Sequence, residues 1–326
     1  MGADPFFSII VPVFNGAKLL PACLQAIKAS AFQSFELIVV DDGSTDGSGQ
    51  VAQDCGARVL TLNGRFGPAH ARNEGATISN GRYLFFTDAD CLLRPDTLAI
   101  AAAILEADPT LDALIGSYND QPADPHFLSQ YKNLSHHYIH QISSSEADTF
   151  WTGCGAIKRD RFAALGGFDA RRYPRPSIED IELGYRLKEE NGRILLAKNV
   201  QVTHLKRWTF TSLLKTDVFD RAVPWLELIA KQGQMPTTLN LQHSQRASVA
   251  FVYLSLLQLF LPRQWRGFFW LWFIPLVWVN RDQYRFFQQK RGWRFTLRAI
   301  PLHWLYFFYS GTAVLFVFGK RLLRPQ

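Results

Sequence analysis

Cysteine and methionine are both scarce in this sequence. Its 326 residues include two methionines and four cysteines, Cys23, Cys55, Cys91 and Cys154. The spacing of the four thiols matches no zinc-binding pattern, which excludes a zinc site built on cysteine pairs. We therefore expect reduced cysteines, as is usual in the cytosolic compartment.

Acidic residues are almost missing from the last quarter of the chain. From residue 244 onward there are twelve Lys and Arg side chains and a single acid, Asp282. This segment carries a net charge of +11, and because the whole chain carries +7, residues 1–243 carry −4. A nucleic-acid footprint would need a basic face on a soluble fold, which residues 1–243 do not offer. We therefore expect no nucleic acid among the partners.

Long apolar runs are missing from the beginning of the chain. The opening residues, MGADPFFSIIVPVFNG, lack a basic region followed by a long apolar stretch, so we expect no signal peptide. Such runs gather near the end, at 247–261, 268–280 and 299–319, with basic residues between them. A bilayer span needs roughly 20 apolar residues, so the first two runs are short and the third is adequate.

Several interpretations of this C-terminal region remain open. The first two runs could form two short helices in a hairpin with Trp265 near the interface, or they could be re-entrant or partly interfacial. Basic residues between apolar and aromatic runs suit an anionic membrane face, which predicts hydrophobic membrane-associated helices over 244–326. Such a region would hold the protein on the cytoplasmic side of the inner (plasma) membrane. The alternative is a buried helical pair in a soluble protein, which would leave many Trp and Phe side chains without an obvious partner.

Residues 1–120 alternate between apolar strands and helices. The strands are expected at 6–14, 35–42, 57–62 and 82–90, and the helices at 17–30, 43–56, 67–80 and 95–108. Strands that are apolar throughout and separated by helices belong to an α/β fold, with a mainly parallel sheet covered by helices on both faces. Ligands bind such sheets beyond the carboxyl ends of the strands. Asn15, Asp41, Asp42, Asp88 and Asp90 lie at such ends.

The pattern from 121 to 243 is less regular. It predicts helices over 124–141 and 178–192, a strand with a glycine loop over 149–159, two short strands within 193–205, and a long amphipathic helix over 212–232. We divide the chain accordingly into a domain of residues 1–243, with halves of about 1–120 and 121–243, and the helical region 244–326.

Two carboxylates stand one residue apart after the fourth strand, in RYLFFTDAD. Asp88 and Asp90 would repel one another, so we expect a positive group between them. A hard divalent cation removes this repulsion, and Mg²⁺ or Mn²⁺ would keep open positions for phosphate oxygens. His204 is a candidate third ligand. The alternative is a capped turn before Pro95 without a metal.

Asp41 and Arg72 each allow two interpretations. Asp41, in VVDDGSTDGS, suits a nucleotide base or ribose, whereas the same stretch also suits helix capping by one of residues 44–46. Arg72, in FGPAHARNEG, suits a bidentate contact with phosphate or a surface ion pair with Glu74.

The last two polar motifs are equally open. Glu179 and Asp180 suit either a favourable charge at a helix start or a general base that takes a proton from a sugar hydroxyl. In THLKRW, Arg207 suits a diphosphate and Trp208 suits stacking on a sugar, whereas a partly buried and satisfied His204 is the alternative to a ligand.

The motifs are more specific in combination than singly. IIVPVFN, VVDDGSTD, GPAHARNEG, DAD, TGCGAIKR, GGFD, EDIELGYRL and HLKRW follow one another in this order. This series resembles glycosyltransferase family 2, the inverting nucleotide-sugar transferases of GT-A fold. The likeness covers about residues 5 to 225.

The resemblance implies a role for each matching position. It places Pro12, Phe14, Asn15, Asp41, Arg72 and Asp88 at the nucleotide, Asp88 and Asp90 at the diphosphate with Mg²⁺ or Mn²⁺, Asp180 as the base with Glu179 beside it, and the Thr152–Gly155 loop, including Gly153, with Trp151 at the acceptor. Arg207 and Trp208 match the QxxRW motif of processive members, in which His204 here replaces the glutamine. That departure argues against processive synthesis.

The resulting hypothesis is the transfer of one sugar from a nucleotide-sugar to a hydroxyl of a lipid-linked, glycan or membrane-proximal acceptor. A UDP-sugar is the default donor because many members of the family use one. The alternatives are a processive polysaccharide synthase, a non-catalytic nucleotide-sugar-binding scaffold, and a nucleotidyltransferase.

Overall fold

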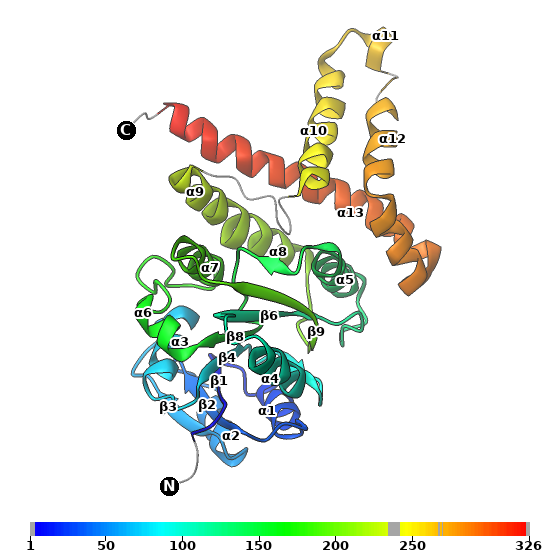
Figure 1. The fold of residues 1–326 in the computed structure, drawn as a ribbon. Helices are drawn as coiled ribbons and strands as arrows, with labels where there is room; N and C mark the ends of the chain where they lie inside the picture. The colour runs from blue at the N-terminus through cyan, green and yellow to red at the C-terminus, as the bar shows by residue number, and fades with distance from the viewer. Residues whose placement is uncertain (1–3, 234–241, 267, 269, 324–326) are drawn as a thin grey trace. The chain divides into compact units, whose positions relative to one another are not determined.

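The chain divides into two units, each with its own core. The computed structural model describes residues 4–233, 242–266, 268 and 270–323 (Figure 1). The sheet unit comprises the residues up to Pro125 together with Ser144–Arg207, and the helical unit comprises His126–Ser143 together with the residues from Trp208 onward. The second unit is thus assembled from two separate stretches of sequence.

The sheet unit is built on a nine-stranded mixed sheet in the order β3-β2-β1-β4-β8-β6-β9-β5, with β7 paired to β9 (Figure 1). The strands are β1 (Phe7–Val13), β2 (Phe35–Asp41), β3 (Arg58–Thr61), β4 (Tyr83–Thr87), β5 (Cys91–Leu93), β6 (Ala113–Tyr118), β7 (Glu146–Ala147), β8 (Cys154–Lys158) and β9 (Ile194–His204). Strands β1 to β4 pair in parallel, and β8 runs antiparallel to β4 and β6. The predicted α/β sheet is confirmed.

Helices connect these strands. They are α1 (Leu20–Lys28), α2 (Ser48–Asp54), α3 (Pro68–Thr77), α4 (Thr97–Ala107), α6 (Arg159–Ala164) and α7 (Glu179–Glu189). The small residues of α3 let it approach the sheet closely, because a Cβ added at Gly75 would lie 2.7 Å from the Ile10 side chain. This close approach brings Arg72, on the same helix, to the sheet.

Some elements escaped prediction. Strand β5 has only three residues, and β6 and α6 gave no distinctive pattern. The two short strands expected within 193–205 are a single strand, β9. Its register against β6 shifts between Ile115 and Ser117, and this irregularity explains why the apolar pattern of β9 looked interrupted.

The helical unit contains α5 (Phe127–Ile142), α8 (Phe210–Leu214), a π-helical segment (Lys215–Ala222), α9 (Val223–Gln232), α10 (His243–Leu257), a 3₁₀ turn (Gln258–Phe260), α11 (Arg263–Arg266), α12 (Trp270–Val279) and α13 (Arg281–Leu323). The long helix predicted over 212–232 is present as α8, the π-helical segment and α9. Within α13, Gly292 has a φ of 80°, so the helix is kinked there.

A buried polar cluster holds this unit together. The Tyr309 hydroxyl of α13 donates to Asp217 Oδ2 at 2.6 Å, and Lys132 of α5 forms an ion pair with the same carboxylate. Because these contacts join α5, the π-helical segment and α13, residues 126–143 and 208–233 belong with the C-terminal helices. The unit boundaries therefore differ from the expected division at residue 243, which sequence pattern alone could not correct.

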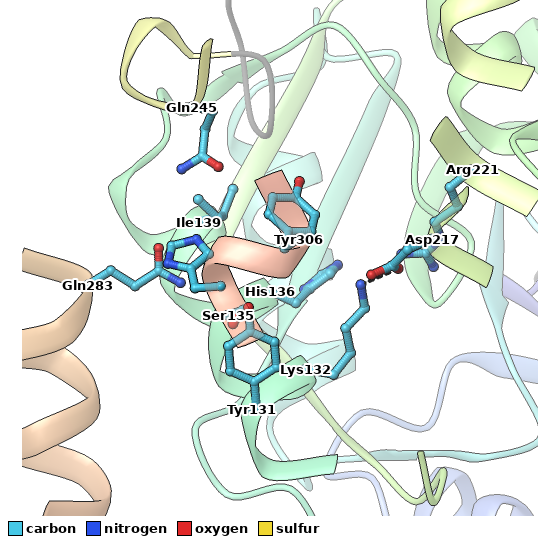
Figure 2. A pocket seen from close by; sticks show the side chains of 11 residues that line it. Tyr131, Lys132, Ser135, His136, Ile139, Asp217, Arg221, Gln245, Gln283 and Tyr306 are labelled. Atoms are coloured by element: carbon cyan, nitrogen blue, oxygen red, sulfur yellow. Dashed lines mark hydrogen bonds and ion pairs between the residues drawn. The ribbon is translucent and has the colours of Figure 1, made fainter. Parts of the chain in front are cut away.

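The polar cluster borders a cavity (Figure 2). The lining residues are Tyr131, Lys132, Ser135, His136, Ile139, Asp217, Arg221, Gln245, Gln283, His303 and Tyr306. Burial lowers the pKa of His303 to about 3, so its imidazole is neutral in this unit at physiological pH. The lining includes none of the site residues predicted from the sequence.

The cysteines give a direct test of the sheet unit. Cys23, Cys91 and Cys154 are buried and Cys55 is partly exposed, and burial raises the pKa of the three buried thiols. We expect a thiol-reactive disulfide reagent to modify one thiol quickly in the native protein and all four in denaturant. Rapid modification of several thiols in the native protein would contradict this packing.

Candidate active site

The predicted site residues gather where β1, β2 and β4 end. Val13 at the end of β1 is in register with Asp41 at the end of β2, and β4 ends at Thr87, directly before Asp88. Since parallel strands present their carboxyl ends at one edge of a sheet, these loops form a common site.

Asn15 and Asp41 organise the first part of this edge. Asn15 has a φ of 51°, its backbone N–H donates to Ser44 Oγ at 2.9 Å, and its Oδ1 accepts from the Thr45 N–H at 2.8 Å. Asp41 Oδ1 accepts from the Ser44 N–H at 2.9 Å. The N-cap of α2 is Gly47, so the alternative of a cap within 44–46 is wrong. These residues instead tie the two loops together.

Two further residues lie close to this loop, Asp42, which was expected at this strand end, and Arg65, which was not predicted. Asp42 is buried, and its two oxygens accept from the Phe66 and Gly67 backbone N–H groups at 2.7 and 2.8 Å. The Arg65 guanidinium lies 4.0 Å from the ring centroid of Phe14, which is 37% exposed. Pro12 is half-buried in β1 beside Val40. An exposed ring covered by a cation is the kind of surface on which a nucleobase could stack.

Arg72 connects two parts of the site that are far apart in sequence. Its Nη2 lies 2.7 Å from Asp88 Oδ1, and its Nη1 lies 2.9 Å from Glu179 Oε1. Burial by itself would lower the pKa of Arg72, but the negative charges of Asp88, Glu179 and Asp180 raise it, so the guanidinium is charged. The alternative of a surface pair between Arg72 and Glu74 is wrong, because Arg72 is buried and Glu74 lies beside His70.

The second acid of the DAD motif has a different partner. His204 Nε2 lies 3.4 Å from Asp90 Oδ2, because β5 pairs with β9 and sets Cys91 opposite His204. The imidazole is buried and stacks on Tyr118 with centroids 4.5 Å apart. Burial would raise the pKa of Asp90, but the hydrogen bond and the charge of His204, with Lys206, lower it below its usual value. Asp88 and Asp90 thus have different partners, Arg72 and His204.

The DAD carboxylates fit a hard divalent cation. Ligand atoms of Asp88, Asp90 and Cys91 lie within 4.8 Å of one another, the only such group that the described residues offer. The Cys91 thiol is fully buried and burial raises its pKa, so it stays protonated and is a poor ligand. The two partly exposed carboxylates are the donors that Mg²⁺ and Mn²⁺ prefer. The role of His204 as a third ligand stays a prediction.

The two acids at the start of α7 have separate environments. Glu179 is buried, and its oxygens accept from Arg72 and from the Ser177 N–H at 2.9 Å. Asp180 is partly exposed, and its Oδ2 accepts from the N–H and the hydroxyl of Thr152 at 3.1 and 3.3 Å. Of the two, Asp180 is therefore the one that a substrate can reach, and Glu179 holds Arg72.

The Trp151 loop lies next to Thr152. A Cβ added at Gly153 would come within 2.5 Å of the Trp151 indole, so glycine is required for the ring to lie against the loop. The indole meets Tyr118 edge-on, with centroids 4.9 Å apart. The prediction had missed Tyr118, whose contacts with both Trp151 and His204 have no local signal in the sequence.

Arg207 and Trp208 fall in different units. Arg207 is exposed at the end of the sheet unit. Trp208 is buried in the helical unit, where it packs with Leu213 and Tyr309, and its backbone N–H donates to Ser129 Oγ at 2.9 Å. The expected stacking of Trp208 on a sugar conflicts with this burial, since a packed indole presents no open face.

Comparison with known families identifies the fold and the class. Residues 8–166 match the family model described as Glycosyl transferase family 2. Residues 8–166 form a glycosyltransferase family 2 domain. Asn15, Asp41, Arg72, Asp88 and Asp90 lie inside this domain, and Asp180 lies beyond it.

Named relatives agree with the family. Glycosyltransferase GlyG of Streptococcus pneumoniae serotype 4 is 34% identical over 127 residues, which is 37% of this chain and 42% of the relative. A PGL/p-HBAD biosynthesis glycosyltransferase of Mycobacterium tuberculosis (strain ATCC 25618 / H37Rv) is 40% identical over 115 residues, 33% of this chain and 45% of the relative. The matches thus span less than half the length of these curated relatives.

Solved structures share the fold. A mannosyltransferase from Pyrobaculum calidifontis, in complex with GDP-Man and Mn²⁺, has a TM-score of 0.52 and 19% identity, covering 99% of this chain and 76% of that one. S. aureus TarS 1–349 in complex with UDP-GlcNAc has a TM-score of 0.54 and 18% identity, covering 94% and 87%. At these identities the likeness shows the GT-A-type fold alone.

Proposed function

We propose that this family 2 glycosyltransferase transfers a single sugar from a nucleotide-sugar to an acceptor hydroxyl, with inversion at the anomeric carbon. The Arg72 bridge is the observation that carries the proposal. It ties Asp88, at the expected diphosphate position, to Glu179, the neighbour of the candidate base Asp180. One buried side chain thus fixes the two ends of the reaction relative to each other.

Asp180 is the proposed base. Two donors from Thr152 fix its Oδ2, which orients the carboxylate toward one direction of attack. Asp180 takes the proton of the acceptor hydroxyl as that oxygen attacks the anomeric carbon. The bond from the anomeric carbon to the nucleoside diphosphate breaks on the opposite face, so a single displacement inverts the configuration. The nucleoside diphosphate leaves with the bonding electrons.

The leaving diphosphate needs positive charge. Mg²⁺ or Mn²⁺ held by Asp88 and Asp90 would supply it when bound, as a Lewis acid on the phosphate oxygens. Arg72 keeps Asp88 in place, and His204 does the same for Asp90. Arg207, exposed at the end of the sheet unit, is a further candidate for contact with the diphosphate.

We take the donor class, a nucleotide-sugar, from the family, and the identity of its nucleobase stays open. The neighbours cited above were solved with GDP-Man and with UDP-GlcNAc, so the shared fold accommodates different nucleotides. We take a UDP-sugar as the default. A lipid-linked or other membrane-proximal acceptor at the cytoplasmic face of the plasma membrane is supported by the basic, apolar composition of residues 244–326.

Nucleotide binding tests the proposal first. Thermal unfolding is measured with UDP, GDP, CDP and dTDP, each with and without Mn²⁺. We expect one nucleotide to stabilise the protein in the presence of Mn²⁺, by about 2.7 kcal/mol at 100 times its Kd. The Asp88→Ala variant should lose the effect. The matched control, Asp54→Ala, removes an exposed carboxylate of the same unit and should keep it. No stabilisation by any nucleotide would favour the scaffold alternative.

A further inference from the structure

Helix α13 has the length and composition of a membrane span, but the residues that it contacts indicate a core helix. Its apolar window within Arg281–Leu322 has a mean hydropathy of 1.3, and 39% of that window is buried. Near the middle of the apolar run, Tyr309 donates to Asp217, which is paired with Lys132. A charged pair at the centre of a bilayer is costly. This contact therefore makes α13 a core helix of its unit.

The α10–α12 hairpin, residues 243–279, is anchored on α13 at its base. Val252 of α10, Leu276 of α12 and Phe307 of α13 form a buried cluster. Asn280, directly after α12, donates through Nδ2 to Ser248 Oγ at 2.8 Å. Figure 1 shows the two helices side by side, extending away from α13. The base is thus fixed, and the far end extends beyond this packing.

Large apolar side chains are exposed along the hairpin and concentrate toward its far end. They are Leu254, Leu257, Phe260, Leu261, Trp265, Phe268, Leu271, Ile274 and Trp278. Phe260 is 85% exposed and Leu257 is 60% exposed. Exposed apolar side chains concentrated on one element in this way mark a site of interaction with a membrane or another protein.

Hydrogen bonds join residues 258–266, the part of the hairpin that we call its tip. Gln258 Nε2 donates to the Trp265 carbonyl at 2.8 Å, and Arg266 Nε donates to the Leu261 carbonyl at 3.0 Å. The exposed apolar side chains are therefore presented on a preformed turn, which lowers the entropic cost of binding.

Charge and length favour one occupant, an anionic bilayer surface. Residues 243–280 contain no acid, and Arg263 and Arg266 are exposed at the tip beside Trp265. Arginine and tryptophan together suit the phosphate level of a bilayer. Helix α10, with 15 residues, is about 22 Å long, short of the roughly 30 Å hydrocarbon core. Insertion to the interfacial depth of about 5–10 Å is the geometry that fits.

We propose that the tip of the α10–α12 hairpin inserts into the surface of an anionic phospholipid bilayer, while α13 stays outside the hydrocarbon as a core helix. The inference rests on the proposed function for its choice of a membrane as partner. In this proposal the protein attaches to one leaflet through the hairpin, and α13 does not span the bilayer. The arginines contact lipid phosphates, and Phe260 and Leu257 enter the acyl boundary.

Vesicle flotation of the purified 326-residue chain tests this. The vesicles contain either phosphatidylcholine alone or phosphatidylcholine with about 30% phosphatidylglycerol. We expect binding to the anionic vesicles and about tenfold or more weaker binding for Leu257→Gln/Phe260→Gln. The matched control is Leu315→Gln/Phe316→Gln, which makes the same kind of change at two exposed positions of α13, 62% and 57% exposed, and should bind as the wild type does. Arg263→Gln/Arg266→Gln should lose the preference for anionic lipid.

Three outcomes would overturn the inference. If Leu315→Gln/Phe316→Gln loses vesicle binding and Leu257→Gln/Phe260→Gln keeps it, α13 is the inserted element. Equal binding of all variants would place the membrane contact elsewhere. The wild-type chain could also form dimers without vesicles and fail to bind any vesicle. If Leu257→Gln/Phe260→Gln then dissociates the dimers, the surface is an interface between copies of this chain.

Nucleotide-dependent stabilisation, measured on the same samples, separates this inference from the proposed function. A hairpin variant that responds to nucleotide but does not float has lost only its membrane contact. A wild-type chain that floats without responding to any nucleotide contradicts the proposed function and leaves the hairpin contact supported.

Discussion

Asp180→Asn is expected to lower the rate of sugar transfer by about 10²–10⁴-fold while leaving nucleotide binding unchanged. Asparagine keeps the shape of the side chain, and its amide oxygen can still accept from the N–H and hydroxyl of Thr152. It cannot take a proton from the acceptor hydroxyl. The loss should therefore appear in kcat and not in the nucleotide-dependent shift of the unfolding temperature.

The measurement is the release of nucleoside diphosphate from the donor identified by the binding screen. Asp169→Asn is the matched control, because Asp169 is an exposed aspartate of the same unit that accepts a backbone N–H at 3.0 Å. It should turn over like the wild type. If Asp180→Asn also retains full activity, the base lies elsewhere and the position of Asp180 beside Thr152 has only a structural role.

Arg72→Met is expected to destabilise the sheet unit by about 3–5 kcal/mol and to abolish transfer. The side chains of Arg72 and Glu179 are 4% and 5% exposed, so the substitution leaves an uncompensated buried carboxylate. Asp88, at 37% exposed, can turn to water and should contribute less of the loss. Adding Glu179→Gln to Arg72→Met should recover part of the stability, because the buried charge is then removed.

Urea unfolding of the single variants and the double variant measures this coupling. Arg94→Met is the control, since Arg94 forms an exposed pair with Asp96 in the same unit and its loss should cost less than about 1 kcal/mol. A cost for Arg72→Met no larger than that for Arg94→Met would show that the bridge is not a buried pair in solution. If the double variant recovers stability but not activity, Arg72 has a role in transfer that is separate from its role in pairing with the buried Glu179.

The sequence predicted the strands and helices around the site because their signals are local. Apolar runs of strand length, such as 35–42, alternated with helical periodicity, such as 95–108, and this pattern needs no knowledge of the partner. Elements such as β5 and β6 escaped because three residues or an undistinguished run become a strand only when a neighbour pairs with them. The caps proposed at 44–46 failed since the side chains of these residues bond residues 15–17 of the adjacent loop instead.

What the sequence determined by itself is the parallel part of the sheet, the acids at its strand ends and the motifs that resemble glycosyltransferase family 2, because each motif or element depends on residues close together in the chain. The tertiary structure decided which charges meet. Arg72 and Glu179 are 107 positions apart, and only the packing of α3 against the sheet brings the arginine between Glu179 and Asp88. Trp208 and one part of α13 are buried for the same reason, since long-range packing, which local pattern does not encode, selects which side chains are covered.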